Sequence, residues 1–226
     1  MKRFWREVTV DDDRVIRLDD RPVRTPGRAP LALPTAALAH AVAEEWRAVG
    51  DTIDPRAMPL TGLANAAIDR IAPDAAAFAR GLAAYADSDL LYYRADQPDE
   101  LVARQAATWD PVLEWARKRY DVHFEPVAGV MHHAQPAATV QQLSDAAAVR
   151  DAFALAPMSP LVTITGTLVG TLALAEGAID ADTLWQAAHV DEDWQVELWG
   201  EDSLATQARD HRRREFDAAV RFLSLL

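Results

Sequence analysis

Residues 30–46 read PLALPTAALAHAVAEEW, and the character of the sequence changes within this stretch. Prolines recur at positions 22, 26, 30 and 34, which confines the chain before Thr35 to turns and edge strands. Thr35 then provides an N-cap, and apolar residues follow at helical spacing from Leu38 to Trp46. The sequence therefore predicts a helix over residues 36–49, preceded by strands.

The residues before this stretch have the pattern of a small β-rich module. Apolar residues alternate with polar ones from Phe4 to Val10, and a second short segment of this kind runs from Val15 to Leu18. Three consecutive aspartates, Asp11 to Asp13, separate the two segments and indicate a turn. We expect two short strands that pair through this turn.

The residues after the stretch are mainly helical in pattern. The periodicity predicts helices over residues 59–71, 74–91, 99–120, 140–153, 160–176 and 180–198, and a last amphipathic helix that ends at Leu226. The predicted fold class is α+β. It consists of a β-rich N-terminal domain over residues 1–57, ending in one helix, and a larger all-α C-terminal domain over residues 58–226.

Composition excludes several classes of function. A net charge of -12 and a pI near 4.9 argue against nucleic-acid binding, which needs clustered Lys and Arg. The chain has no cysteine, so disulfides and thiolate chemistry are excluded. The N-terminus lacks the apolar segment of a signal peptide, and the longest apolar run, residues 158–175, is too polar to span a membrane. We expect a cytoplasmic protein with no signal or transit peptide and no membrane insertion.

Motifs for cofactors and common catalytic sites do not occur in the sequence. The nine glycines form neither GxGxxG nor GxxxxGK, and no serine lies in a GxSxG turn. His132 and His133 are adjacent, so their side chains point in different directions and are poor joint metal ligands. We expect no cofactor, no metal and no enzyme active site of these kinds.

Carboxylates are concentrated in residues 191–202, which read DEDWQVELWGED. On a helical wheel that continues from Leu184 at roughly 100° per residue, Asp193 and Glu197 fall on the polar face. Asp191, Glu192 and Gln195 fall within the apolar arc instead. Because an unpaired buried carboxylate is costly, two alternatives remain open. These side chains either pair inside the fold, with Arg70, Arg94 or Arg104 available, or they line a surface that a partner covers.

Aromatic and basic residues could serve either the fold or the binding of a partner. Trp46, Trp109 and Trp115 recur at helical spacing with aliphatic residues and are predicted to lie in the core. Trp199 lies at the predicted end of a helix, directly before Gly200, and is a candidate apolar anchor for a partner. The basic run at 211–215, HRRRE, is predicted to be a solvated helix face, with a partner contact as the alternative.

Seven motifs in fixed order resemble a known family over residues 2–202. They read RFW-x-x-V-T-V, LDDRPVRTP, LPT-x(3)-LA-x(2)-VA-x-EW, DTIDP-x(2)-MPLT-x-LANAAID, DSDLLYYR, W-x-PVLEWARKRY and A-x(2)-VDEDWQ-x(3)-WG. Together they resemble the assembly chaperone of the F-type ATP synthase that acts on the α subunit of the catalytic sector, and the composition resembles a bacterial member.

This resemblance implies a two-domain fold, no catalysis, no cofactor and a protein client, the α subunit before it pairs with β. The last motif of the family carries an acidic residue regarded as important for function. In this motif and directly after it we predict the partner-binding residues Asp191, Glu192, Gln195, Trp199 and Glu201. His189 replaces an arginine common in the family, and Asp191 is one methylene shorter than the usual glutamate. We expect a monomer.

Two rival functions stay open on the sequence alone. The first is a small acidic enzyme in which Glu192 or Asp191 acts as a general base. The second is a permanent structural subunit of a larger complex.

Overall fold

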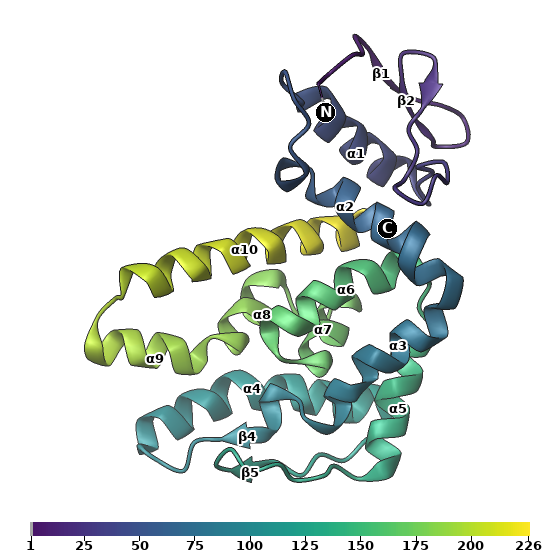
Figure 1. Cartoon of the computed structure of the whole chain (residues 1–226). Coiled ribbons are helices and arrows are strands. Elements are labelled where there is room, and N and C mark those ends of the chain that lie inside the picture. The colour runs from purple at the N-terminus through teal and green to yellow at the C-terminus, as the bar shows by residue number, and fades with distance from the viewer. Residues whose placement is uncertain (1) are drawn as a thin grey trace. The chain divides into compact units, whose positions relative to one another are not determined.

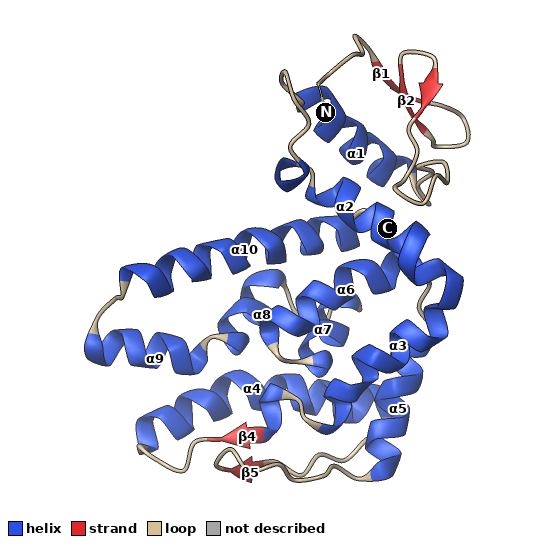
Figure 2. Ribbon diagram, viewed as in Figure 1, coloured by secondary structure: helices blue, strands red, loops and turns tan. Residues whose placement is uncertain are grey.

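The computed structural model describes residues 2–226 (Figures 1 and 2). Its strands are β1 (Val8–Val10), β2 (Ile16–Leu18), β3 (Arg21–Pro22), β4 (Tyr93–Arg94) and β5 (Val127–Ala128). Its α-helices are α1 (Ala36–Ala48), α2 (Pro59–Ala66), α3 (Ala75–Ala83), α4 (Asp99–Tyr120), α5 (Ala137–Ala148), α6 (Ala152–Thr165), α7 (Leu168–Ala175), α8 (Ala181–Ala188), α9 (Val190–Trp199) and α10 (Ser203–Ser224). The predicted fold class, a small N-terminal strand region followed by a mostly helical body, is confirmed.

The chain divides into two compact units. The first unit contains the residues up to Ala75, together with Asp151–Pro160 and Glu215–Leu226. The second unit contains Ala76–Arg150 and Leu161–Arg214. Each unit is thus assembled from segments far apart in the sequence, and the linear domain boundary after residue 57 stays a prediction.

The first unit begins with an antiparallel sheet in the order β1-β2-β3. Val8 pairs with Leu18 and Val10 with Ile16, so the two predicted segments form a hairpin. The turn between them is held by Asp11, whose Oδ1 accepts hydrogen bonds from the backbone N–H of Asp13 and of Val15. The aspartate cluster therefore acts as the turn that the sequence predicts.

Helix α1 begins where the sequence predicts. The Thr35 hydroxyl oxygen accepts a hydrogen bond from the backbone N–H of Leu38 at 3.1 Å, which caps the helix. Its buried face includes Trp46, whose predicted place in the core is confirmed. Glu45 binds the start of α2, because its two carboxylate oxygens accept the backbone N–H groups of Leu60 and Thr61 at 2.8 Å. Burial raises the pKa of the Glu45 carboxyl despite these bonds.

In the second unit, α4 has the predicted bounds and supplies a buried face. Trp109 is buried, and its indole N–H donates to the backbone carbonyl of Ala187 at 2.7 Å. The prediction that Trp109 lies in the core is confirmed, whereas Trp115 is only half-buried. The parallel pair β4 and β5 lies beside α4 (Figure 2), in register Tyr93 with Val127.

The predicted helix over residues 160–176 is wrong, because the chain breaks between α6 and α7. Gly166 adopts a positive φ of 69°, which favours glycine, and Thr167 caps α7 by accepting from the backbone N–H of Gly170. The buried carboxylate of Asp89 also accepts from the N–H of Val169 at 2.9 Å. Burial raises the pKa of Asp89 to about 6.

Other predicted helix bounds need similar correction. The helix predicted over 74–91 ends at Ala83 and continues as short 3-10 turns. The helix predicted over 140–153 ends at Ala148, and Phe153 belongs to α6. No helix within residues 2–226 is both long and apolar enough to cross a lipid bilayer.

Candidate protein-binding site

The predicted helix over residues 180–198 is divided into α8 and α9 at His189. His189 has φ -120° and ψ 15°, outside helical geometry, and its Nδ1 lies 2.8 Å from the carbonyl oxygen of Trp185. The imidazole also stacks on the Trp185 indole, with ring centroids 3.9 Å apart. This buried stack fixes the end of α8 and changes the direction in which α9 presents its side chains.

The break makes the helical-wheel prediction for α9 wrong in part. Val190 is the only buried residue of this helix, and Gln195, placed by the wheel in the apolar arc, is exposed. Leu198 and Trp199 are 54% and 77% exposed. The wheel failed because it continued the phase of α8 across His189.

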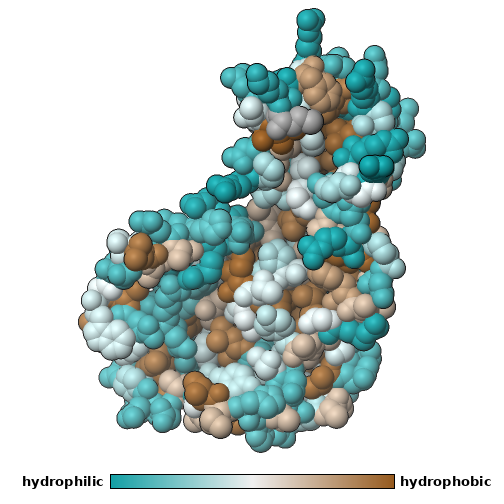
Figure 3. All heavy atoms as spheres, in the orientation of Figure 1, coloured by the Kyte–Doolittle hydropathy of each residue, from teal (hydrophilic) through white to brown (hydrophobic). Residues whose placement is uncertain are grey.

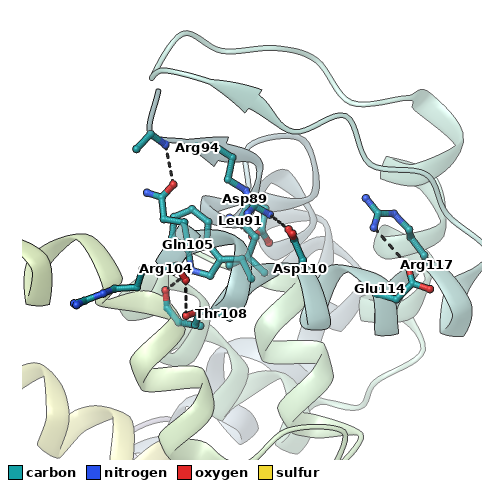
Figure 4. A network of polar contacts seen from close by, with 12 residues as sticks. Asp89, Leu91, Arg94, Arg104, Gln105, Thr108, Asp110, Glu114 and Arg117 are labelled. Atoms are coloured by element: carbon teal, nitrogen blue, oxygen red, sulfur yellow. Dashed lines mark hydrogen bonds and ion pairs between the residues drawn. The ribbon is translucent and has the colours of Figure 1, made fainter. Parts of the chain in front are cut away.

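Asp191 is held by a buried glutamine. The Nε2 of Gln105 donates to Oδ1 of Asp191 at 2.7 Å, and Gln105 itself is only 1% exposed. The Oε1 of Gln105, the side chain labelled in Figure 4, accepts a hydrogen bond from the backbone N–H of Ala95, which follows β4, also at 2.7 Å. Gln105 therefore ties α9 to the segment after β4 through its two amide atoms.

Glu192 is paired inside the second unit, although with none of the arginines considered from the sequence. Its two carboxylate oxygens lie 3.0 and 3.1 Å from Nη2 of Arg212. Of the arginines considered, Arg104 binds Glu197 through two hydrogen bonds, and Arg94 binds Asp110 (Figure 4). Of the two alternatives left open by the sequence, pairing inside the fold therefore applies to Glu192, and its partner is a basic residue of α10.

The basic run at 211–215 takes part in this pairing. Arg212 binds Glu192, and Arg213 binds Asp182 at 2.7 Å while its guanidinium lies over the Trp185 ring. Asp193, predicted to be on a solvated face, pairs with Arg209 at 2.5 Å. These side chains therefore keep part of their surface in water but are ion-paired, because α10 packs its cations against the acids of α8 and α9.

An open groove of about 580 Å³ lies between α9 and the β4–α4 segment, and α9 runs beside α4 (Figure 1). Its lining consists of Leu90, Tyr93, Arg94, Ala95, Asp96, Pro98, Leu101, Gln105, Gly129, Val130, Asp191, Trp194, Gln195, Leu198 and Trp199. Most of the surface that these side chains offer is apolar. On the face shown in Figure 3, hydrophobic side chains likewise interrupt the hydrophilic surface.

The predicted site residues divide between this groove and a smaller cavity. Asp191, Gln195 and Trp199 line the groove. Glu192 and Glu201 instead line a cavity of about 200 Å³. α9 contributes to both of these adjacent hollows, but the five residues do not form one cluster.

Sequence reasoning missed the loop after β5. Val130 lines the groove and is 91% exposed, and the next residue, Met131, is 81% exposed. The signal was an apolar pair between Gly129 and two histidines. His132 contacts Asp87 at 3.4 Å, and His133 contacts Glu125 at 3.0 Å, so each histidine attaches the loop to a different acid.

The geometry offers contact surface and little catalytic apparatus. No group of three or more His, Cys, Asp or Glu side chains that could hold a metal ion occurs within residues 2–226. Asp89, in the motif DSDLLYYR, is fully buried and caps helix α7. The groove can therefore bind an apolar surface and orient it through a few polar groups.

Comparison with known proteins assigns the chain to a family. The model of the ATP12 chaperone protein family matches residues 2–117. The chain belongs to the ATP12 chaperone family.

Solved structures extend the match over nearly the whole chain. Atp12 from Paracoccus denitrificans is 41% identical, with a TM-score of 0.93 over 99% of this chain and 97% of that one. A mutant of the same Atp12p gives 41% identity and a TM-score of 0.94, with the same coverage. The Atu1473 protein from Agrobacterium tumefaciens is 39% identical, with a TM-score of 0.91 over 99% of this chain and 85% of that one.

Proposed function

We propose that this ATP12-family chaperone binds the unassembled α subunit of the F-type ATP synthase and holds it until it pairs with β. An unassembled subunit exposes surface that its neighbour will later cover, and a chaperone lowers the population of aggregation-prone states by covering it first. The chain acts in the bacterial cytoplasm, as a monomer, without catalysis.

The observation that carries the proposal is the exposed apolar pair Leu198 and Trp199 beside the groove. Large aromatic and aliphatic side chains left in water at the edge of a groove are typical of protein-binding surfaces. Val130 and Met131 on the loop after β5 add two more exposed apolar side chains. The proposed contact surface therefore consists of these four residues with the groove.

The polar residues predicted from the sequence have two roles in this proposal. Asp191 and Gln195 contact the client in the groove, with Trp199 as its apolar anchor. Glu192, bound by Arg212, supports the helix that presents them, and Glu201 is an exposed acid available to a basic client surface. We prefer the chaperone to an enzyme that uses Glu192 as a general base, because both oxygens of the Glu192 carboxylate already lie within hydrogen-bond distance of Arg212.

Co-expression with the α and β subunits of the same organism tests the proposal. We expect the chain to co-purify with α in the absence of β, and to be missing from the finished enzyme. A permanent structural subunit would stay in the finished enzyme. If α remained soluble without this chain and never bound it, the proposed function would be wrong.

Matched variants locate the surface. The change Leu198→Ser with Trp199→Ser should abolish capture of α, because it removes the anchor. Val149 is a suitable control, since it is 84% exposed and lines none of the groove. Val149→Ser should capture α like the unmodified chain, and equal losses in both variants would contradict the assignment of the surface.

A further inference from the structure

The charged groups of the groove are unequally compensated. Arg94 already binds Asp110 at 2.7 Å and the carbonyl oxygen of Leu91, and its guanidinium lies over the Trp109 ring. Asp96 and Asp191 also line the groove, yet within residues 2–226 neither has an ion-pair partner. The groove therefore carries an excess of negative charge.

Of the two acids, Asp191 is the better placed to bind a cation. Its only hydrogen-bond donor within the described residues is the Nε2 of Gln105, which is neutral and cannot balance a carboxylate charge. The Gln105 amide cannot turn away without losing its other bond, from the backbone N–H of Ala95. The carboxylate is thus held in a fixed direction, with Oδ2 available to a further donor.

The apolar surroundings of Asp191 would strengthen its attraction to a counter-ion. Trp194, Leu198 and Trp199 follow it on α9 and line the same groove, so an occupant that covers them also removes water from the carboxylate. A charge pair strengthens as water is excluded, and an unpaired carboxylate under the same cover is costly. A suitable occupant brings its own cation.

From this charge complementarity we propose that the groove binds an apolar segment of the client that carries one Lys or Arg. The cationic head pairs with Asp191, while the flanking apolar side chains cover Leu198 and Trp199. The inference rests on the proposed function, and it adds the chemistry by which the client segment is selected.

Peptides test the inference directly. Fluorescent 15-residue peptides that tile the α subunit are titrated with the full chain, and binding is followed by anisotropy. The tightest peptides are expected to contain a basic residue between large apolar residues. Exchange of that residue for Met in the peptide should weaken binding roughly tenfold to a hundredfold, the range for a hydrogen bond to a charged group.

The Asp191→Asn variant completes a double-mutant cycle. It keeps an oxygen that can accept from Gln105 and removes only the charge. It should weaken binding of the basic peptide, whereas the Met-exchanged peptide should bind the variant at least as tightly as it binds the unmodified chain, because that peptide leaves the Asp191 charge unpaired. Asp145→Asn is the control, because Asp145 lies on α5, binds Gln141 and lines none of the groove. The exchange in the peptide needs no protein variant, so the test stands even if Asp191→Asn does not fold.

Each outcome has a defined meaning. The inference is overturned if the tightest peptides lack a basic residue, or if Asp191→Asn binds intact α as well as the unmodified chain does. It is also overturned if sedimentation shows that a second copy of the chain occupies the groove. Failure of the unmodified chain to bind intact α would instead overturn the proposed function itself.

Discussion

The carboxylate of Asp89 caps helix α7 from 80 residues away, by accepting a hydrogen bond from the backbone N–H of Val169 at 2.9 Å. Its other oxygen accepts the backbone N–H of Leu91 at 3.1 Å. One buried side chain thereby binds backbone N–H groups in two separate segments of the second unit. The first N–H groups of a helix have no partner within the helix itself.

Asp89→Asn should lower the free energy of unfolding by about 1–3 kcal/mol, the cost of a buried donor left without its acceptor. Asparagine offers one acceptor oxygen, so either Val169 or Leu91 loses its partner. Urea unfolding at pH 7.5 measures the loss. An unchanged free energy of unfolding would show that Asp89 is not needed as a cap.

His189 should make the stability of the chain depend on pH. Burial lowers the pKa of this imidazole, and the cations Arg209 and Arg212 lower it further, against the opposing effects of the Trp185 carbonyl and Glu192. The unfolded chain therefore binds the proton more readily. The stabilising contribution of neutral His189 is complete above the unfolded pKa of about 6.5 and is lost as the pH falls below it.

The measurement compares the unmodified chain with His189→Asn, whose side-chain amide can still donate to the carbonyl of Trp185. Between pH 7.5 and pH 5.5 the unmodified chain should lose more unfolding free energy than the variant does. Parallel pH profiles for the two proteins would rule out His189 as the source.

Gly170→Ala should be destabilising although it replaces glycine by a better helix former. A Cβ atom at this position would lie 2.7 Å from Cδ1 of Leu184 and 2.8 Å from Cγ2 of Thr167, both fully buried. The crowding should cost about 1–3 kcal/mol. Gly81→Ala in α3 is the control, since nothing lies within 4 Å of its Cβ, and it should be neutral or stabilising. Thermal unfolding of both variants tests the contrast.

Helix bounds could be predicted from the sequence where neighbouring residues end the helix. Helix α4 has the predicted bounds because Pro98 precedes it and Asp121, in the left-handed region with φ 53°, follows it. The break before α7 was missed although Gly166 and Thr167 lie there. The surrounding sequence is apolar throughout, and the cap that Asp89 adds comes from another part of the chain.

The candidate site was predictable only in outline for the same reason. The sequence indicated α9 by its concentration of acids and tryptophans. It could not indicate that Gln105 would hold Asp191 or that Arg212 would bind Glu192, because these pairs span 86 and 20 residues. The exposure of Gln195 followed from the break at His189, which tertiary stacking on Trp185 fixes.

The exposed apolar residues of α9 should contribute little to the stability of the free chain. Leu198 and Trp199 are mainly in water, so Leu198→Ser with Trp199→Ser should change the free energy of unfolding by no more than about 0.5 kcal/mol, as for other surface positions. The same variant should bind less of the hydrophobic dye ANS, because it removes apolar surface, whereas Val149→Ser lies outside the groove and should leave its ANS signal largely unchanged. Urea unfolding and ANS fluorescence on the same samples provide the test. A loss of more than about 1.5 kcal/mol would mean that the two side chains pack within the free protein, and they would then be unavailable to a client.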